Sequence, residues 1–599
     1  MSQSLDLAPV GNCSMSSLID REGRHVWACA PRFDSDPVFS ALLSGRDPAE
    51  DADAPGHWSV ELEGCAETRQ AYLRNTPILR TELIDASGSS LEIIDFAPRY
   101  RHQGRIYRPT ALVRLIRPLH GAPVIRIRLR PVAQWGARLA ERTSGSNHIR
   151  YLCDDVTLRL STNCPVSHVI SERPFRLEEP LALFLGPDEG FEGAVLSTCE
   201  RMLSQTTRLW MEWVRTLAVP LEWQDEVIRA AITLKLCAYE ETGAIVAALT
   251  TSIPENANSG RNWDYRYCWI RDAYYVVQAL NRLGAVDILE NYLSFLRNLV
   301  DRSRAGRVQP VYGVGLEPAL TERIIESLPG YRGMGPVRDG NQAHEHDQHD
   351  VYGQIVLSST QAFFDRRMLR QSTVEDFRAL EEVGERAFQM HDKPDAGLWE
   401  FRTRASVHTY SAVMCWAACD RLANVAEQLG LQDRRDHWIE RAGIVRRAIE
   451  GKAWNSDLGR YAASFGSHEL DASLLQMVDL RFLAHDDPKY QATFAAIERE
   501  LRRGPYLLRY AEPDDFGEPK TAFNFCTFWF IEALYLAGRH EEARALFQEM
   551  LSRRTHAGLF SEDISFADGE LWGNYPQTYS LVGLINCAVL LSRPWSSVR

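Results

Sequence analysis

The chain has 599 residues, of which 45% are apolar and 25% charged, and its formal net charge is −13 at pH 7. This length is too great for one ordinary core, so we expect two or more domains, and the composition excludes an intrinsically disordered chain. The acidic balance argues against nucleic acid as a partner, because an acidic surface repels a phosphate backbone.

The first residues of the sequence do not have the pattern of a secretory signal. Residues 1–17, MSQSLDLAPVGNCSMSS, lack the basic stretch and following apolar stretch of a secretory signal. No segment has the length of an uncharged membrane span. The twelve Cys are scattered without a Cys-x-x-Cys pair, which is typical of buried thiols in a reducing compartment and not of a zinc site. We expect a cytoplasmic protein with no membrane partner.

Residues up to about 200 have the pattern of short strands. LEIIDFAPRY (91–100), ALVRLIRPL (111–119), VIRIRLRPV (124–132) and VTLRLSTN (156–163) alternate apolar with polar residues. Such half-buried strands, separated by Gly, Pro, Asn or Asp, predict an antiparallel β-sandwich. We assign this N-terminal domain to residues 1–200 and a helical linker to residues 201–222.

From residue 223 onward the periodicity is helical. Nearly all-round apolar segments such as YSAVMCWAACDRLA alternate with charged amphipathic ones such as DRRDHWIERAGIVRRAIE, which predicts buried helices covered by outer ones. Six such hairpins would make an (α/α)6 barrel over residues 223–599, with a pocket built from its loops. The expected helices are 223–241, 271–283, 285–301, 350–366, 374–391, 408–429, 432–452, 470–482, 488–503, 522–538, 540–553 and 576–592.

The first chemically rich cluster is NWDYRYCWIRD (262–272), just before a predicted helix. Arg271 and Asp272 could grip vicinal hydroxyls, since a guanidinium donates and a carboxylate accepts hydrogen bonds. Trp263 or Trp269 could stack on a sugar face. A helix cap with a surface ion pair explains the same residues equally well.

Two more clusters each contain a carboxylate of interest. Glu400 lies in GLWEFR (397–402), where its apolar neighbours would favour the protonated form that a general acid needs. Glu562 and Asp563 lie in GLFSED (558–563), before the last buried helix. Taken alone, these carboxylates are better explained as solvated side chains in loops.

The segment HEHDQHD (344–350) holds three His and three carboxylates, a composition that suits zinc. A compact hydrogen-bonding loop is the alternative interpretation, and the one we favour. In that case Gln348 or Asp350 could contact a substrate.

Taken together and in order, NWDYRYCWIRDA, GLWEFR with HTYSAVMCW, LDASLL (470–475) and GLFSEDIS with GNYPQTYSLVGLIN resemble glycoside hydrolase family 15. This family contains glucoamylases, glucodextranases and trehalases. The resemblance extends from SLIDREGRHVWACAPRFDSDPVFSALL near the N-terminus to the last helix, and it implies the sandwich and barrel that the periodicity also predicts.

The resemblance also implies roles for individual residues. Glu400 would be the general acid, Glu562 the general base, and Arg271 with Asp272 would hold the non-reducing glucose. Three further residues would bind substrate: Trp269, Trp399 and Arg509. An inverting enzyme needs its two carboxyls about 6.5–9.5 Å apart, so that a water fits between the base and the sugar.

The implied activity is an inverting, exo-acting α-glucosidase that releases β-glucose without a cofactor or metal. Its partner would be a small oligosaccharide or disaccharide, with glucoamylase-type action expected first and α,α-trehalase as the alternative. Lys520 and Gln354 depart from the family pattern and leave the substrate beyond the first glucose open. A non-catalytic sugar-binding protein and a metal hydrolase built on HEHDQHD are more distant alternatives.

Overall fold

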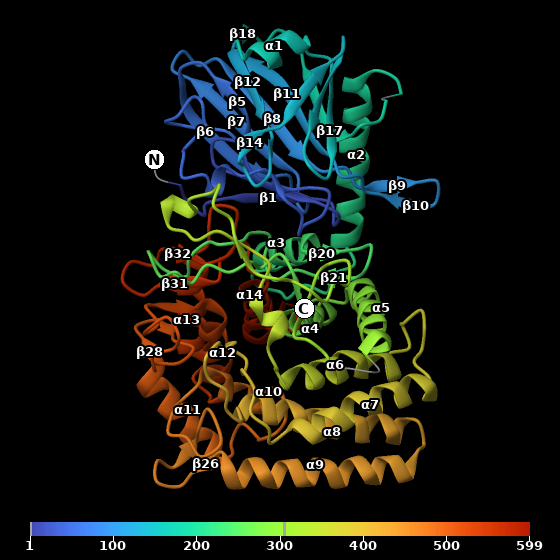
Figure 1. Cartoon of the computed structure of the whole chain (residues 1–599), viewed down its shortest axis with the longest axis vertical. Helices are drawn as coiled ribbons and strands as arrows, with labels where there is room; N and C mark the ends of the chain where they lie inside the picture. The colour runs from blue at the N-terminus through green and yellow to red at the C-terminus, as the bar shows by residue number, and fades with distance from the viewer. Residues whose placement is uncertain (1–2, 191, 304–306, 599) are drawn as a thin grey trace.

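The structure is a computed structural model that describes residues 3–190, 192–303 and 307–598. Figure 1 shows two parts, with strands from the first third of the chain above and helices from the remainder below. The confirmed part of the expected fold is therefore an antiparallel β-rich N-terminal region followed by a helical C-terminal region.

Two large antiparallel sheets dominate the N-terminal part, called here the two-sheet region (residues 8–187). The first runs in the order β1 Ala8–Gly11, β2 Ser16–Ile19, β3 His25–Cys29, β5 His57–Leu62, β12 Val124–Arg130 and β18 Phe175–Arg176, with β4 Pro37–Phe39 paired to β3. The second runs in the order β15 Glu141–Ser144, β16 His148–Leu152, β17 Thr157–Thr162, β19 Leu181–Pro187, β11 Leu112–His120, β8 Ser90–Phe96, β7 Leu79–Asp85 and β6 Cys65–Tyr72.

Alternating burial explains why these segments form strands. In β7 the buried residues Leu79, Thr81 and Leu83 alternate with half-buried ones, as expected when one face of a strand packs on a core. Between the sheets, the Arg114 guanidinium donates to the Asp95 carboxylate at 2.7 Å, and both side chains are fully buried. This pair satisfies two charges that could not otherwise remain inside the core.

Helix α2 (Val195–Val214) follows the last strand and packs along β19, β9 (Tyr100–His102) and β11, beside the sheets in Figure 1. It overlaps the expected linker, 201–222, but begins earlier and ends earlier. The division of the chain at residues 200 and 222 stays a prediction.

Helices form in the predicted places of the C-terminal region. They are α3 Gln224–Leu236, α4 Ile270–Arg282, α5 Val286–Ser303, α6 Asp350–Thr360, α7 Val374–Met390, α8 Thr409–Gln428, α9 Gln432–Lys452, α11 Pro488–Leu501, α12 Asn524–Leu536, α13 His540–Ser552 and α14 Thr578–Leu591. The expected helix 470–482 is instead a 3-10 turn, η5 (Ala472–Leu475), and a short α10 (Gln476–Asp479). Asp471 caps the turn through Ser473 N, and Arg481, at φ +63°, ends the helix early.

The helices pack as inner and outer elements. Going round the inner set, α4 contacts α6, α6 contacts α8, α8 contacts α10 and η5, η5 contacts α12, α12 contacts α14, and α14 contacts α4. Outer helices cover them, and α9 shows why: its buried residues Trp438, Ala442, Val445 and Ile449 form one stripe at helical spacing.

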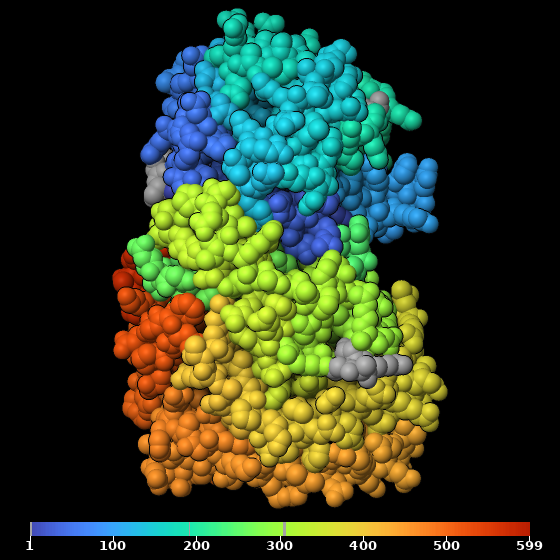
Figure 2. All heavy atoms as spheres, in the orientation of Figure 1, coloured from blue at the N-terminus to red at the C-terminus, as the bar shows by residue number. Residues whose placement is uncertain are grey.

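A long segment before α6 joins the two parts. Figure 2 shows the yellow-green residues around 316–340 lying against the blue atoms of the two-sheet region. Arg332 donates to Gln3 O at 2.6 Å, and Ser327 donates to Trp135 O at 2.7 Å. Within the described ranges, no helix is both long and apolar enough to cross a membrane.

Candidate active site

One cavity lies where the N-terminal ends of the inner helices meet. The residues that the sequence analysis singled out for catalysis and substrate binding all line it: Trp269, Arg271, Asp272, Trp399, Glu400, Arg509 and Glu562. They come from segments before or at the start of α4, α8, α12 and α14. Residues that are far apart in the chain therefore surround one space of about 90 Å³, enough for several waters or part of a sugar.

Glu400 lies in a tight turn before α8. Its own φ is +62°, an uncommon conformation for a residue other than Gly, and Gly397 three residues earlier has φ +69°. Trp269 Nε1 donates to Glu400 Oε1 at 2.7 Å, and Arg271 donates to the same oxygen at 3.1 Å. Glu400 Oε2 has no hydrogen-bond partner within the described chain, so it is the oxygen left to exchange a proton with a ligand.

Arg271 and Asp272 lie in the first turn of α4 and are buried. Arg271 is fixed by Leu398 O at 2.7 Å and by the Tyr579 hydroxyl at 2.6 Å. Burial raises the pKa of Asp272 to about 7, and the negative charge of Glu400 adds to this, whereas Arg271 opposes it. A buried Arg and carboxyl side by side can donate to and accept from sugar hydroxyls.

Glu562 faces the same cavity from just before β31 (Asp563–Ser565). The Tyr265 hydroxyl donates to Glu562 Oε1 at 2.6 Å, while Oε2 is buried without a hydrogen-bond partner in the described residues. Gly573 leaves room for this side chain, because a Cβ there would lie 2.8 Å from Oε2. Oε2 is therefore a buried acceptor without a partner in a side chain that lines the cavity.

The pKa of Glu562 is raised well above its usual range. Burial is the main cause, and the negative charges of Asp563 and Glu255 add to it. The hydrogen bond from Tyr265 and the charge of Arg509 oppose the shift. A carboxylate with a raised pKa is a stronger base, but it becomes ionised only at a correspondingly higher pH.

Another wall of the cavity contains Arg509, which pairs with Glu255 at 2.5 Å. Glu255 also accepts from Trp263 Nε1 at 3.1 Å, so it links two residues of the wall. Trp399 Nε1 donates to Asp471 at 2.7 Å, which fixes the indole beside Glu400. These polar contacts hold large side chains in place without occupying the cavity.

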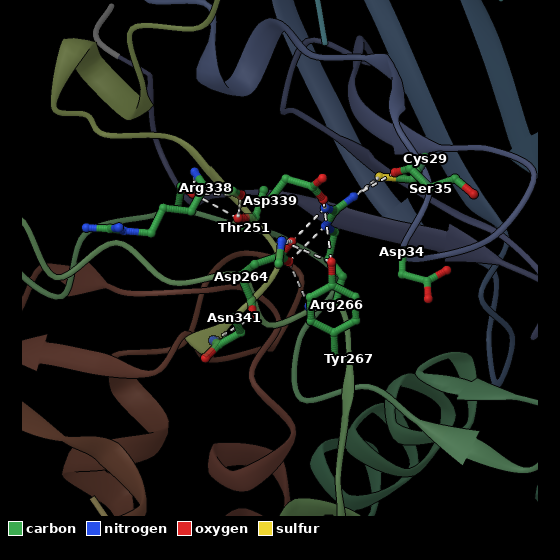
Figure 3. A network of polar contacts seen from close by, with 12 residues as sticks. Cys29, Asp34, Ser35, Thr251, Asp264, Arg266, Tyr267, Arg338, Asp339 and Asn341 are labelled. Atoms are coloured by element: carbon green, nitrogen blue, oxygen red, sulfur yellow. Dashed lines mark hydrogen bonds and ion pairs between the residues drawn. The ribbon is translucent and has the colours of Figure 1, made fainter. Parts of the chain in front are cut away.

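A buried network anchors the segment that carries Tyr265 and Trp269 (Figure 3). Arg266 is fully buried and pairs with Asp264 at 2.7 Å and with Asp339 at 3.1 Å. The same guanidinium donates to Ser35 O at 2.6 Å, in the two-sheet region. The N-terminal part of the chain thus helps to hold one wall of the cavity.

The segment HEHDQHD is divided between several structural roles. His346 lines the cavity, Gln348 accepts from Arg271 at 3.2 Å, and Asp350 accepts from Gln354 at 2.6 Å. The described residues contain no group of three or more His, Cys, Asp or Glu arranged to hold a metal. Neither Gln348 nor Asp350 is among the described residues that line the cavity, and Gln348 instead contacts Arg271, which does line it.

Sequence reasoning did not assign several residues that the structure places in the cavity. They include Tyr265, Tyr579, Glu255 and Arg402. Tyr265 and Tyr579 lay within the quoted motifs, but no spacing rule links them to partners in distant parts of the chain. Glu255 carried no signal in the sequence. Lys520, which departs from the family pattern, is exposed and is not among the described residues that line the cavity.

Comparison with known proteins identifies the family. Residues 223–589 match glycosyl hydrolases family 15, and residues 6–161 match a trehalase-like N-terminal family. A trehalase from Thermoplasma volcanium is 30% identical, covering 97% of this chain and 92% of that protein. A trehalase from Mycobacterium tuberculosis is 31% identical, covering 98% and 89%. A solved glucoamylase from Saccharomycopsis fibuligera is 12% identical, with a TM-score of 0.46, covering 61% of this chain and 94% of that chain. This protein therefore belongs to glycosyl hydrolases family 15 and is a glycosidase.

Proposed function

We propose that the protein is an inverting α,α-trehalase. The observation that carries the proposal is the near full-length similarity to curated trehalases, in both the two-sheet region and the helical region. This favours the disaccharide over the maltodextrin substrate of a glucoamylase, which the sequence analysis placed first.

In this mechanism Glu400 is the general acid and Glu562 the general base. Glu400 Oε2 gives its proton to the glycosidic oxygen as the bond to the anomeric carbon breaks. Glu562 Oε2 takes a proton from the water that attacks this carbon from the opposite face. Trp269 and Arg271 remain on Glu400 Oε1 and stabilise the carboxylate that forms.

The substrate-binding residues keep their proposed roles. Arg271 and Asp272 bind hydroxyls of the glucose whose bond is cleaved, and Trp269, Trp399 and Arg509 shape the pocket around the disaccharide.

We also propose that the ring of inner and outer helices is an (α/α)6 barrel and that the two sheets form a β-sandwich. Their division into domains at 1–200 and 223–599, joined by 201–222, belongs to the same proposal.

The anomers released test the mechanism directly. Inversion at one carbon of α,α-trehalose yields one β-glucose, while the leaving glucose keeps its α configuration. Early proton NMR spectra should therefore show α- and β-glucose in equal amounts, whereas a retaining enzyme would release only the α anomer. Maltose, isomaltose, maltotriose and starch complete the panel, and faster cleavage of maltose than of trehalose would overturn the substrate assignment.

Substitution of the acid tests the residue assignment. Glu400→Gln keeps the shape of the side chain but has no proton to give, and we expect kcat to fall by about 10²–10⁴-fold with the fold intact. Glu469→Gln makes the same chemical change at a partly exposed carboxyl that pairs with Arg404, and it serves as the control with unchanged kcat. Near-normal turnover by Glu400→Gln would exclude Glu400 as the acid.

A further inference from the structure

A second cavity, called here the distal cavity, lies at the other end of the helical ring. It has a volume of about 810 Å³, within the range of small-molecule sites. Its walls come from the C-terminal halves of inner helices, with Arg282 ending α4, Thr360 ending α6 and Gln428 ending α8. The catalytic cavity lies at the N-terminal ends of the same helices.

Several polar side chains that line the distal cavity have no hydrogen-bond partner among the described residues. The half-buried amides of Gln278 and Asn586 have no side-chain hydrogen bond within the described chain, and Asn586 Oδ1 is itself buried. Glu532 also has neither a hydrogen bond nor an ion pair among the described residues. Amide and carboxyl groups that are held inside a cavity without partners can bind hydroxyls, which both donate and accept.

The charges of the distal cavity favour a neutral ligand. Three Arg line the distal cavity: Arg282 pairs with Asp479 at 3.7 Å, Arg421 donates to Leu480 O at 2.7 Å, and Arg481 is exposed to solvent. The carboxylates of Asp479 and Glu427 lie in the same lining and offset most of this positive charge. Burial raises the pKa of Glu532 to about 8, and the charge of Asp479 adds to this. The Glu532 carboxyl is then mostly protonated at neutral pH and acts as a donor as well as an acceptor.

Aromatic rings form the floor of the distal cavity. Tyr274, Tyr275 and Trp529 all line it and are nearly buried. The C–H face of a sugar packs well on such rings, because their faces are negatively polarised. Amides, a carboxyl and aromatic rings in one cavity make up the chemistry of a sugar site.

The floor of the distal cavity packs against the wall of the catalytic cavity. The ring of Trp529 lies 6.4 Å from that of Trp399, and the ring of Tyr275 lies 5.5 Å from that of Tyr579. Trp399 and Tyr579 line the catalytic cavity, and Tyr579 fixes Arg271. Two layers of aromatic side chains, one from each cavity, therefore lie between the two cavities.

We propose that the distal cavity is a second, non-hydrolytic binding site for a neutral mono- or disaccharide. The proposal goes beyond the hydrolytic function, because its recognition elements are separate from Glu400 and Glu562. It applies to glucose as well as to trehalose, since the free amides would recognise hydroxyls whatever the linkage.

Calorimetry on the full-length Glu400→Gln protein tests this site without turnover. Titration with trehalose and, separately, with glucose should show two classes of binding site. Asn586→Leu in this background should weaken one class by at least about 10-fold and leave the other unchanged. Gln548→Leu, at an exposed position on the outer helix α13, is the matched control and should leave both classes unchanged.

A second variant, Gln428→Trp, tests the same site if Asn586→Leu fails to fold. Gln428 is exposed at the mouth of the distal cavity, so the larger side chain fills the cavity without disturbing the core. It should weaken the same class of site as Asn586→Leu. A single class of site in Glu400→Gln, or a second class that neither variant alters, would overturn the proposal. If the wild-type protein does not hydrolyse trehalose, the glucose titration still tests the distal cavity. The proposed trehalase function and the proposed distal site can therefore fail separately.

Discussion

At the scale of single residues, the hydroxyl of Tyr265 lowers the pKa of the proposed base, Glu562, against the larger effect of burial. It donates to Glu562 at 2.6 Å and so stabilises the ionised carboxylate, against burial and the charges of Asp563 and Glu255. The base must be ionised to accept a proton from water. In the wild type, the acidic limb of the pH profile of kcat/KM should therefore have its midpoint above the usual pKa range of Glu. Activity should rise as the pH increases through this midpoint.

Tyr265→Phe should move this limb further upward. A hydrogen bond to a charged group contributes about 1.5–3 kcal/mol, which corresponds to about 1–2 pH units. The measurement is the pH profile of kcat/KM on trehalose. Tyr72→Phe, whose hydroxyl donates to Pro9 O in the two-sheet region, should leave the limb in place. A downward shift in Tyr265→Phe would contradict the role of this hydroxyl.

At the scale of elements, periodicity predicted nearly every long helix, because an apolar face at helical spacing needs only local sequence. The range 470–482 was the exception. Asp471 caps a 3-10 turn at the start of this range, and Arg481, with a left-handed backbone conformation, ends the short helix that follows. Neither feature appears as a periodic pattern in the sequence. Family motifs brought Glu400 and Glu562 to attention, yet the contacts that position them come from Tyr265 and Trp269. Such pairings depend on how distant segments pack, which a single sequence does not state.

The segment 262–272 carries Tyr265 and Trp269, and its anchor is Arg266. Removing this side chain leaves Asp264 buried without its cation, so Arg266→Ala should destabilise the fold by about 3–5 kcal/mol. It should also lower kcat/KM, because Trp269 and Tyr265 lose their fixed positions. Chemical denaturation and trehalose kinetics measure the two effects. Arg208→Ala, at an exposed ion pair on α2, should change stability by less than about 1 kcal/mol. Equal losses in the two variants would refute the anchoring role.

At the scale of the whole molecule, one apolar core runs through both parts of the chain. Trp27 and Trp58 of the two-sheet region belong to the same cluster as Leu249, Ile270 and the inner helices. Trp27 Nε1 also donates to Leu249 O at 2.8 Å, which ties β3 to the segment before α4. The segment before α4 also carries Trp263, Tyr265 and Trp269, which line the catalytic cavity. The two-sheet region therefore supports the active site as well as adding to the core.

This shared core has a consequence for the thiols of the molecule. All twelve Cys are free, and Cys65 alone is exposed, whereas the others are buried in the two parts or between them. Burial shields them from reagents and raises the pKa of thiols such as Cys268 to about 12, which removes the reactive thiolate. Ellman's reagent should therefore titrate one thiol in the native protein, none in Cys65→Ser, and twelve in denaturant.

Activity on trehalose should survive this modification, because Cys65 lies on β6, at the edge of the second sheet, and the described residues that line the catalytic cavity include no Cys. The Cys65→Ser protein should keep its kcat and lose its reaction with the reagent. If several thiols react at the rate of Cys65 and activity falls with them, the core between the two parts opens in solution. The rigid support of the catalytic cavity by the two-sheet region would then be wrong.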